Sequence, residues 1–135
     1  MSTTVSDVTQ SPLRIMIIDD SDEVRSALAG VIDGQSDLLC VAVAGGVDEG
    51  VRLVLEHEPD VVILDVSMPD GGGLRAAKEL TAWAPQTKIV AFSAFDKPLI
   101  TKAMTAAGAV SYISKSASLP ELLAAIRETR TPTAP

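Results

Sequence analysis

The chain alternates regularly between short, β-branched apolar runs and segments in which apolar residues recur at helical spacing. This alternation constrains the fold more than any other feature. The apolar runs are Arg14–Asp19, Leu38–Ala44, Val61–Leu64, Lys88–Phe92 and Val110–Ile113. Continuous apolar runs of this length are typical of strands buried on both faces of a parallel sheet. The sequence therefore predicts an α/β fold of five βα units with right-handed crossovers and helices on both faces of the sheet.

The predicted helices have recognisable ends. The first helix starts at Ser21 or Asp22, either of which can cap its N-terminus, and ends before Gly34. The other four are predicted from apolar residues at helical spacing and from proline or glycine near their ends. They cover approximately Val47–Leu55, Gly73–Trp83, Pro98–Ala107 and Leu119–Ile126.

The domain organisation follows from length and local composition. A chain of 135 residues, 47% of them hydrophobic, provides one core and is too short for two domains of ordinary size. The Ser- and Thr-rich start, which closes with Pro12, predicts a flexible arm over residues 1–12. We expect the folded domain over residues 13–128 and a linker or tail over residues 129–135.

Charge and cysteine content restrict the possible partners. The formal net charge of −7 disfavours direct binding to DNA, because affinity for phosphate backbones depends on basic residues. No apolar run approaches the roughly 20 residues of a membrane span, so no membrane partner is expected. Cys40 is the single cysteine and cannot form an internal disulfide, which fits a cytoplasmic location.

Four of the five predicted strands end in, or are followed closely by, a reactive polar side chain. Asp19 and Asp20 close the first strand, and Asp65 follows the third. Ser93 closes the fourth strand, and Lys115 comes shortly after the fifth. Each has an ordinary explanation by itself, such as a helix start or a turn, but the functional crevice of an open α/β sheet lies beyond these strand ends. Their joint placement indicates a site.

The residue types indicate the chemistry of this site. Clustered carboxylates repel one another in a partly desolvated crevice, and a hard divalent cation is the simplest compensation. Mg²⁺ fits best, because it is commonly held by one or two carboxylates together with water and phosphate oxygens. One carboxylate can then attack a phosphoryl group while the cation and Lys115 stabilise its oxygens, which would produce an aspartyl phosphate.

These residues stand in motifs that resemble the receiver domains of bacterial two-component response regulators. The motifs occur in the family's order and at similar distances: IMIIDDSDEVR, VVILDVSMPDGGGL, IVAFSA and GAVSYISKS. The PDVVILD segment and the last motif are most similar to the NarL subfamily. The resemblance covers nearly all of the predicted folded region. It implies a flavodoxin-like (βα)5 doubly wound sheet with the strand order 2-1-3-4-5.

The resemblance also implies roles for individual residues. Asp65 would be the phosphoacceptor and would ligate Mg²⁺ together with Asp20. The carbonyl group of Ser67 would supply a third protein oxygen, and Asp19 would support the ion through water.

Three further roles are implied at the ends of the last two strands. Ser93 and Lys115 would contact the phosphoryl oxygens, and Tyr112 would be the aromatic side chain that moves when the hydroxyl group of Ser93 shifts. Ser93 stands where many members have threonine, which keeps the hydroxyl group. Ser116 stands where many members have a cis proline, and a trans peptide bond is expected here because a cis bond before a residue other than proline costs about 3 kcal/mol.

As a member of this family the chain would be a signalling switch rather than a turnover enzyme. It would catalyse its own phosphorylation from the phosphohistidine of a cognate histidine kinase, and its own slow dephosphorylation. Phosphorylation would shift a two-state equilibrium, with homodimerisation as one possible result. NarL-type proteins usually carry a helix-turn-helix output domain, so DNA binding and transcription regulation would require a domain beyond these 135 residues. The Thr and Pro tail is compatible with a linker and with a natural end.

Two alternatives belong to other functional classes. A haloacid-dehalogenase-like phosphatase also uses an aspartate after a parallel strand, but Ser67 stands where that family has its second carboxylate. The other alternative is a receiver-like interaction module that works without phosphorylation, because a fold can persist when its function changes.

Overall fold

The computed structural model of the chain describes residues 11–69, 72–94 and 97–130. Most of the predicted N-terminal arm and the end of the predicted tail lie outside the described residues. The elements are, in order, β1 (Leu13–Ile18), α2 (Asp22–Asp33), β2 (Leu38–Ala44), α3 (Val47–His57), β3 (Val61–Asp65), α4 (Gly72–Trp83), β4 (Lys88–Ser93), α5 (Pro98–Ala106), β5 (Ala109–Ser114) and α6 (Leu119–Glu128). Strands and helices alternate as predicted.

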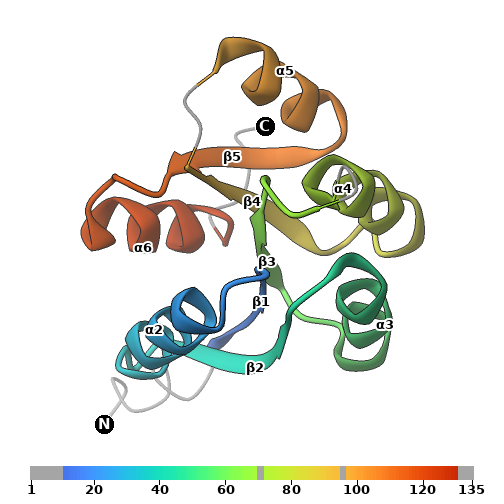
Figure 1. Cartoon of the computed structure of the whole chain (residues 1–135). Coiled ribbons are helices and arrows are strands. Elements are labelled where there is room, and N and C mark those ends of the chain that lie inside the picture. The colour runs from blue at the N-terminus through green and yellow to red at the C-terminus, as the bar shows by residue number, and fades with distance from the viewer. Residues whose placement is uncertain (1–10, 70–71, 95–96, 131–135) are drawn as a thin grey trace, which may run out of the picture.

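The strands form one parallel sheet in the order β2-β1-β3-β4-β5, which confirms the expected doubly wound topology (Figure 1). Helices α2 and α6 cover one face of the sheet, and α3, α4 and α5 cover the other (Figure 1). Both faces of the central strands are therefore removed from water, which explains why these strands are apolar along their whole length.

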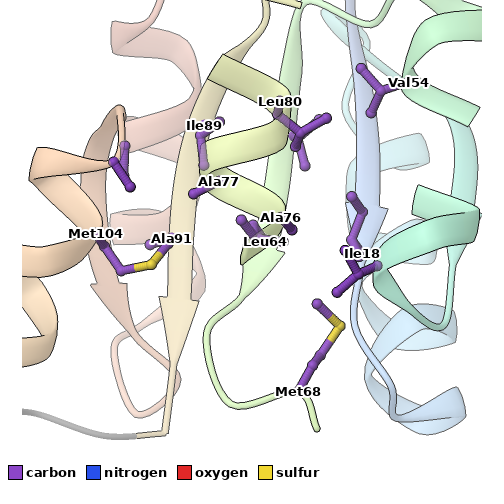
Figure 2. Packing of buried hydrophobic residues seen from close by; sticks show 14 of the residues in the cluster. Ile18, Val54, Leu64, Met68, Ala76, Ala77, Leu80, Ile89, Ala91 and Met104 are labelled. Carbon is purple, nitrogen blue, oxygen red and sulfur yellow. The ribbon is translucent and has the colours of Figure 1, made fainter. Parts of the chain in front are cut away.

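Each face of the sheet carries its own core, because successive side chains of a strand point to opposite faces. Met16 and Ile18 of β1 pack toward α3 and α4, whereas Ile15 and Ile17 pack toward α2 and α6. Figure 2 shows the first of these cores, in which Leu80 of α4 lies among strand residues. Full burial of a side chain of this size stabilises the fold by about 1.5–3 kcal/mol, so both cores contribute substantially to holding the strand ends in place.

The helix ends show which sequence signals determined the boundaries. Ser21 is the N-cap of α2, and its Oγ accepts a hydrogen bond of 3.2 Å from the backbone N–H of Val24. Gly34 caps the other end with an ordinary right-handed backbone (φ −74°), so no special conformational freedom of glycine is needed there. Gly108, which follows α5 and its C-cap, has φ +116°, a value that other residues rarely adopt.

The described part of the chain has no cis peptide bond, so the bond between Lys115 and Ser116 is trans, as predicted. In the same part, no helix has both the length and the apolar character needed to cross a bilayer.

The close packing at the start of α4 can be tested at Gly73, with Gly30 of α2 as a matched control. A Cβ atom on Gly73 would lie 2.4 Å from the Cα atom of Val66 and 2.8 Å from the carbonyl oxygen of Asp65, and neither backbone atom can move easily. We expect Gly73→Ala to lower the free energy of unfolding by about 2 kcal/mol, because overpacking in a rigid region is costly. Gly30 in α2 has no atom near its Cβ position, so Gly30→Ala should raise the free energy of unfolding by about 0.5–1 kcal/mol. Urea unfolding followed by circular dichroism measures both; equal effects would contradict the packing argument.

Candidate functional site

Three carboxylates meet at the carboxyl ends of β1 and β3. Asp19 and Asp20 follow β1, and Asp65 is the last residue of β3. The two strands are neighbours with Ile18 opposite Leu64, so the residues that follow are brought side by side. One oxygen from each carboxylate lies within 4.8 Å of the others. Asp19 and Asp65 are each only 1% exposed, whereas Asp20 is exposed, so the cluster is a buried pair with one member at the surface.

Lys115 joins this cluster from the segment after β5. Its Nζ lies 3.0 Å from Oδ2 of Asp19 and 3.3 Å from Oδ1 of Asp65. Its backbone N–H donates a 2.6 Å hydrogen bond to the carbonyl group of Ser93, which places the segment beside β4. Burial alone would lower the pKa of Lys115, but the hydrogen bond to Asp19 and the charges of Asp65 and Asp19 outweigh it and raise that pKa. Lys115 therefore carries a positive charge at neutral pH.

The two oxygens of Asp65 have different surroundings. Oδ1 accepts hydrogen bonds from the backbone N–H of Ser67 at 3.0 Å and from its hydroxyl group at 2.9 Å, and it also faces Lys115. Oδ2 is buried and has no hydrogen-bond donor among the described residues. A buried polar atom without a partner is costly, which indicates that Oδ2 is kept for a ligand or a reaction.

Asp20 experiences the repulsion between the carboxylates. Partial burial raises its pKa, and so do hydrogen bonding and charge from Asp65 and the charge of Asp19. Lys115 neutralises only one of the three negative charges that the cluster carries when it is fully ionised. The remaining negative charge and the close oxygen ligands of the three carboxylates suit a divalent cation such as Mg²⁺.

The structure brings together the other predicted residues to different degrees. Ser67 contacts Asp65 directly, through its N–H and hydroxyl groups. Ser93 is fully buried at the end of β4, next to β3. Tyr112 is half-buried on β5, where it pairs with Ala91 and packs against the core under α3, α4 and α5. It therefore lies on the edge strand of the sheet, two strands away from β3, which carries Asp65.

Two features of the site were not predicted. One is the direct ion pair of Asp19 with Lys115, whose Nζ donates a hydrogen bond to Oδ2 of Asp19. Arg25 was not singled out, yet its Nη1 donates a 2.7 Å hydrogen bond to the carbonyl group of Asp19. The sequence signal that could have identified Arg25 is its position about one helical turn after the acidic residues that start α2. Pairs of acidic and basic residues at this spacing are common on helix surfaces, so the signal is weak.

This site can support attack on an electrophilic phosphorus atom. Asp65 offers a carboxylate whose Oδ1 is held in place and whose Oδ2 has no donor in the described part of the chain. The ammonium group of Lys115 lies close enough to stabilise charge that develops on the oxygens of an incoming group.

The repulsion at Asp20 predicts a stability change that depends on pH. Because folding raises the pKa of Asp20, this group favours the folded state at low pH, and that contribution is lost as the pH rises through the folded-state pKa. Without divalent cations at pH 7, Asp20→Asn should raise the free energy of unfolding by up to about 1 kcal/mol, a small value because exposed charges are screened. The gain should disappear below about pH 4, where the carboxyl group is protonated.

Urea unfolding in the presence of a chelator, at pH 4 and pH 7, measures this effect. Glu23→Gln removes an exposed carboxylate of the same acidic segment outside the cluster and should not stabilise the chain. A loss of stability in Asp20→Asn at pH 7 would contradict the repulsion argument.

Comparison with known proteins identifies the family. The response regulator receiver domain family matches residues 15–127. The oxygen regulatory protein NreC of Staphylococcus epidermidis is 38% identical over 116 residues, which are 85% of this chain and 53% of that protein. The response regulator GacA of Pseudomonas viridiflava is 34% identical over 115 residues, which are 85% of this chain and 54% of that protein.

Solved structures agree with these relatives. The response regulator domain of Thermotoga maritima CheB has a TM-score of 0.82 and 31% identity, over 91% of this chain and 99% of that one. A LuxR-family response regulator from Aurantimonas has a TM-score of 0.82 and 32% identity, over 87% of this chain and 84% of that one. The chain spans about half the length of the curated relatives it matches. It belongs to the receiver domains of two-component response regulators, which act as signalling switches.

Proposed function

We propose that Asp65 accepts a phosphoryl group from the phosphohistidine of a histidine kinase. The observation that carries this proposal is the buried Oδ2 of Asp65, which has no donor among the described residues and lies in a cluster with Asp19, Asp20 and Lys115. A carboxylate oxygen in this state is available as a nucleophile, while its partner oxygen is held by Ser67.

The transfer is an in-line displacement at phosphorus. Oδ2 of Asp65 forms a bond to phosphorus while the bond between phosphorus and the kinase imidazole nitrogen breaks. The electron pair of the broken bond stays on that nitrogen, which leaves as neutral imidazole when the other ring nitrogen carries a proton. Phosphoryl transfer has a loose transition state, so most of the catalysis comes from positioning and charge stabilisation.

The chain's own residues supply this positioning. Ser67 fixes the orientation of the Asp65 carboxylate through its two hydrogen bonds, and Lys115 can turn from Asp65 toward the new phosphoryl oxygens. Asp20, Asp65 and the carbonyl group of Ser67 would hold Mg²⁺, with Asp19 supporting it through water. When bound, Mg²⁺ supplies positive charge that offsets the charge of the carboxylates and the phosphoryl group. The close approach of the three carboxylates fits such an ion.

The switch would connect the phosphorylated site to the surface formed by α5, β5 and α6. The hydroxyl group of Ser93 would shift toward the phosphoryl group, and Tyr112 would move inward in response. Ser93 lies at the end of β4 and Tyr112 on the adjacent β5, so a movement at one can be transmitted to the other through two paired strands. Contacts available only in the phosphorylated state would bias the equilibrium between the two arrangements.

The biological setting is part of the same proposal. A cognate histidine kinase would be the phosphodonor, and the domain, over residues 13–128, would work in the cytoplasm and could form a homodimer when phosphorylated. Several relatives are named as transcriptional or response regulators, and the matched segment covers only 53–54% of their length. Transcription regulation would therefore require a DNA-binding output domain in addition to this one.

The phosphoacceptor role can be tested by intact-mass spectrometry. Incubation with acetyl phosphate or with a panel of phosphorylated histidine kinases should add one phosphoryl group in the presence of Mg²⁺. The adduct should be lost with a chelator and in Asp65→Asn, because the nucleophile is removed. Asp48→Asn, which changes an exposed carboxylate on α3 outside the cluster, should be phosphorylated like the wild type. No adduct from any donor would favour an interaction module that works without phosphorylation.

The switch can be tested separately with the single tyrosine of the chain. Replacement of Tyr112 by 3-fluorotyrosine gives one ¹⁹F resonance, and we expect phosphorylation to shift it because the ring moves. Ser93→Ala should still be phosphorylated but should show a much smaller shift, because the hydroxyl group that links the two residues is lost. A full shift in phosphorylated Ser93→Ala would exclude Ser93 as the link.

A further inference from the structure

We propose that Arg25 is a positioning residue for the cation site, and that its guanidinium group holds the peptide between Asp19 and Asp20 in the geometry that binds the cation. This inference deepens the proposed function, because the cation concerned is the Mg²⁺ ion of that site. Arg25 itself does not contact the bound ion; it acts through the backbone that carries two of the carboxylates.

The first observation is the position of the guanidinium group between β1 and α2. Nη1 donates a hydrogen bond of 2.7 Å to the carbonyl oxygen of Asp19, and Nη2 pairs with the carboxylate of Asp22 in the first turn of α2. The Arg25 side chain is only 20% exposed and its hydrogen bond to Asp19 is partly buried, whereas Asp22 is 90% exposed, so the pair with Asp22 is an ordinary surface pair. Arg25 therefore ties the end of β1 to the helix that follows it.

The second observation is a close approach to Gly45, directly after β2. A Cβ atom on Gly45 would lie 2.9 Å from Nη1 and 3.5 Å from Cζ of Arg25, so the guanidinium group occupies the space that any larger residue would need. The backbone N–H of Gly45 donates to the carboxylate of Glu49 at 3.0 Å, which holds this residue in place. The guanidinium group thus rests against a fixed backbone.

Together these contacts hold the Asp19 backbone from both sides. Its N–H donates a 3.0 Å hydrogen bond to the carbonyl group of Ala44, and its carbonyl group accepts from Arg25. That carbonyl belongs to the peptide that joins Asp19 to Asp20, so its orientation determines where the Asp20 side chain leaves the backbone. Asp20 is the exposed member of the cluster, and a fixed backbone limits the conformations that it must give up when a cation binds.

The chemistry of the guanidinium group suits this role. Arg25 places a permanent positive charge beside an acidic segment that includes Asp19, Asp20 and Asp22, and its planar fork can donate to two acceptors at once. Groups that hold metal ligands without touching the metal typically change metal affinity by about 10–100-fold when they are removed. We therefore expect Arg25→Ala to bind Mg²⁺ about tenfold more weakly than the wild type.

The test is isothermal titration of Mg²⁺ into the full chain without any phosphodonor. Arg25→Ala should show the tenfold loss, and Arg25→Lys, which keeps the charge but not the fork, should lie between it and the wild type. Gly45→Ala should also weaken binding, because the new methyl group displaces the guanidinium group; the backbone of Gly45 is not in the left-handed region, so alanine is tolerated there. In the double variant the two losses should not add, because the guanidinium group that Gly45→Ala displaces is already gone.

Non-additivity separates positioning from a general loss of stability, and urea unfolding of each variant checks that the fold is intact. Arg52→Ala removes an exposed arginine of α3 whose ion pair is with Glu56 rather than with the cluster, and should bind Mg²⁺ like the wild type. Wild-type affinity in Arg25→Ala, or an undiminished Gly45→Ala effect in the Arg25→Ala background, would overturn the inference. So would the absence of Mg²⁺ binding by the wild type.

These results are distinguishable from a failure of the proposed function. Cation binding is measured here without phosphoryl transfer, so a wild type that binds Mg²⁺ but is never phosphorylated would contradict the proposed function alone. A wild type that is phosphorylated on Asp65, combined with unchanged Mg²⁺ affinity in Arg25→Ala, would contradict the role of Arg25 alone.

Discussion

The pairing of Lys115 with Asp19 and Asp65 is the interaction on which the rest of the site depends. The two carboxylates are almost completely buried, and buried charges of the same sign are tolerated only when an opposite charge is close. Lys115 supplies that charge from the other half of the chain and so ties the ends of β1 and β3 to the segment after β5. It leaves part of the negative charge uncompensated, and this residual charge makes a divalent cation a natural ligand.

The sheet topology makes this interaction possible. The strand order places β1 beside β3, so their carboxyl ends present Asp19 and Asp65 side by side, and β4 carries Ser93 to the same edge. The two cores on either side of the sheet hold the strand ends in register without contributing to the chemistry. The proposed switch would act on β4 and β5, which carry Ser93 and Tyr112.

Much of the fold and of the site could be predicted, because the signals are local. The apolar runs and the cap at Ser21 each act within a few residues, and both were confirmed by the structure. The candidate residues could be identified because strand ends in such a sheet converge on one edge. The direct pairing of Lys115 with Asp19 and the contacts of Arg25 with Asp19 were missed, because they join side chains to partners that the strand pattern does not specify.

The sequence by itself determined the alternation of strands and helices, the two-faced burial of the sheet and the set of polar residues at its carboxyl edge, since these depend on hydrophobic periodicity and on residues close together along the chain. Only the tertiary structure decided which oxygen of Asp65 has no donor among the residues described, where the ammonium group of Lys115 lies and how the guanidinium group of Arg25 rests against Gly45. The physical reason is that these features depend on distances of a few ångströms between side chains and backbone from separate elements. Such distances are set by packing of the whole domain rather than by any local pattern.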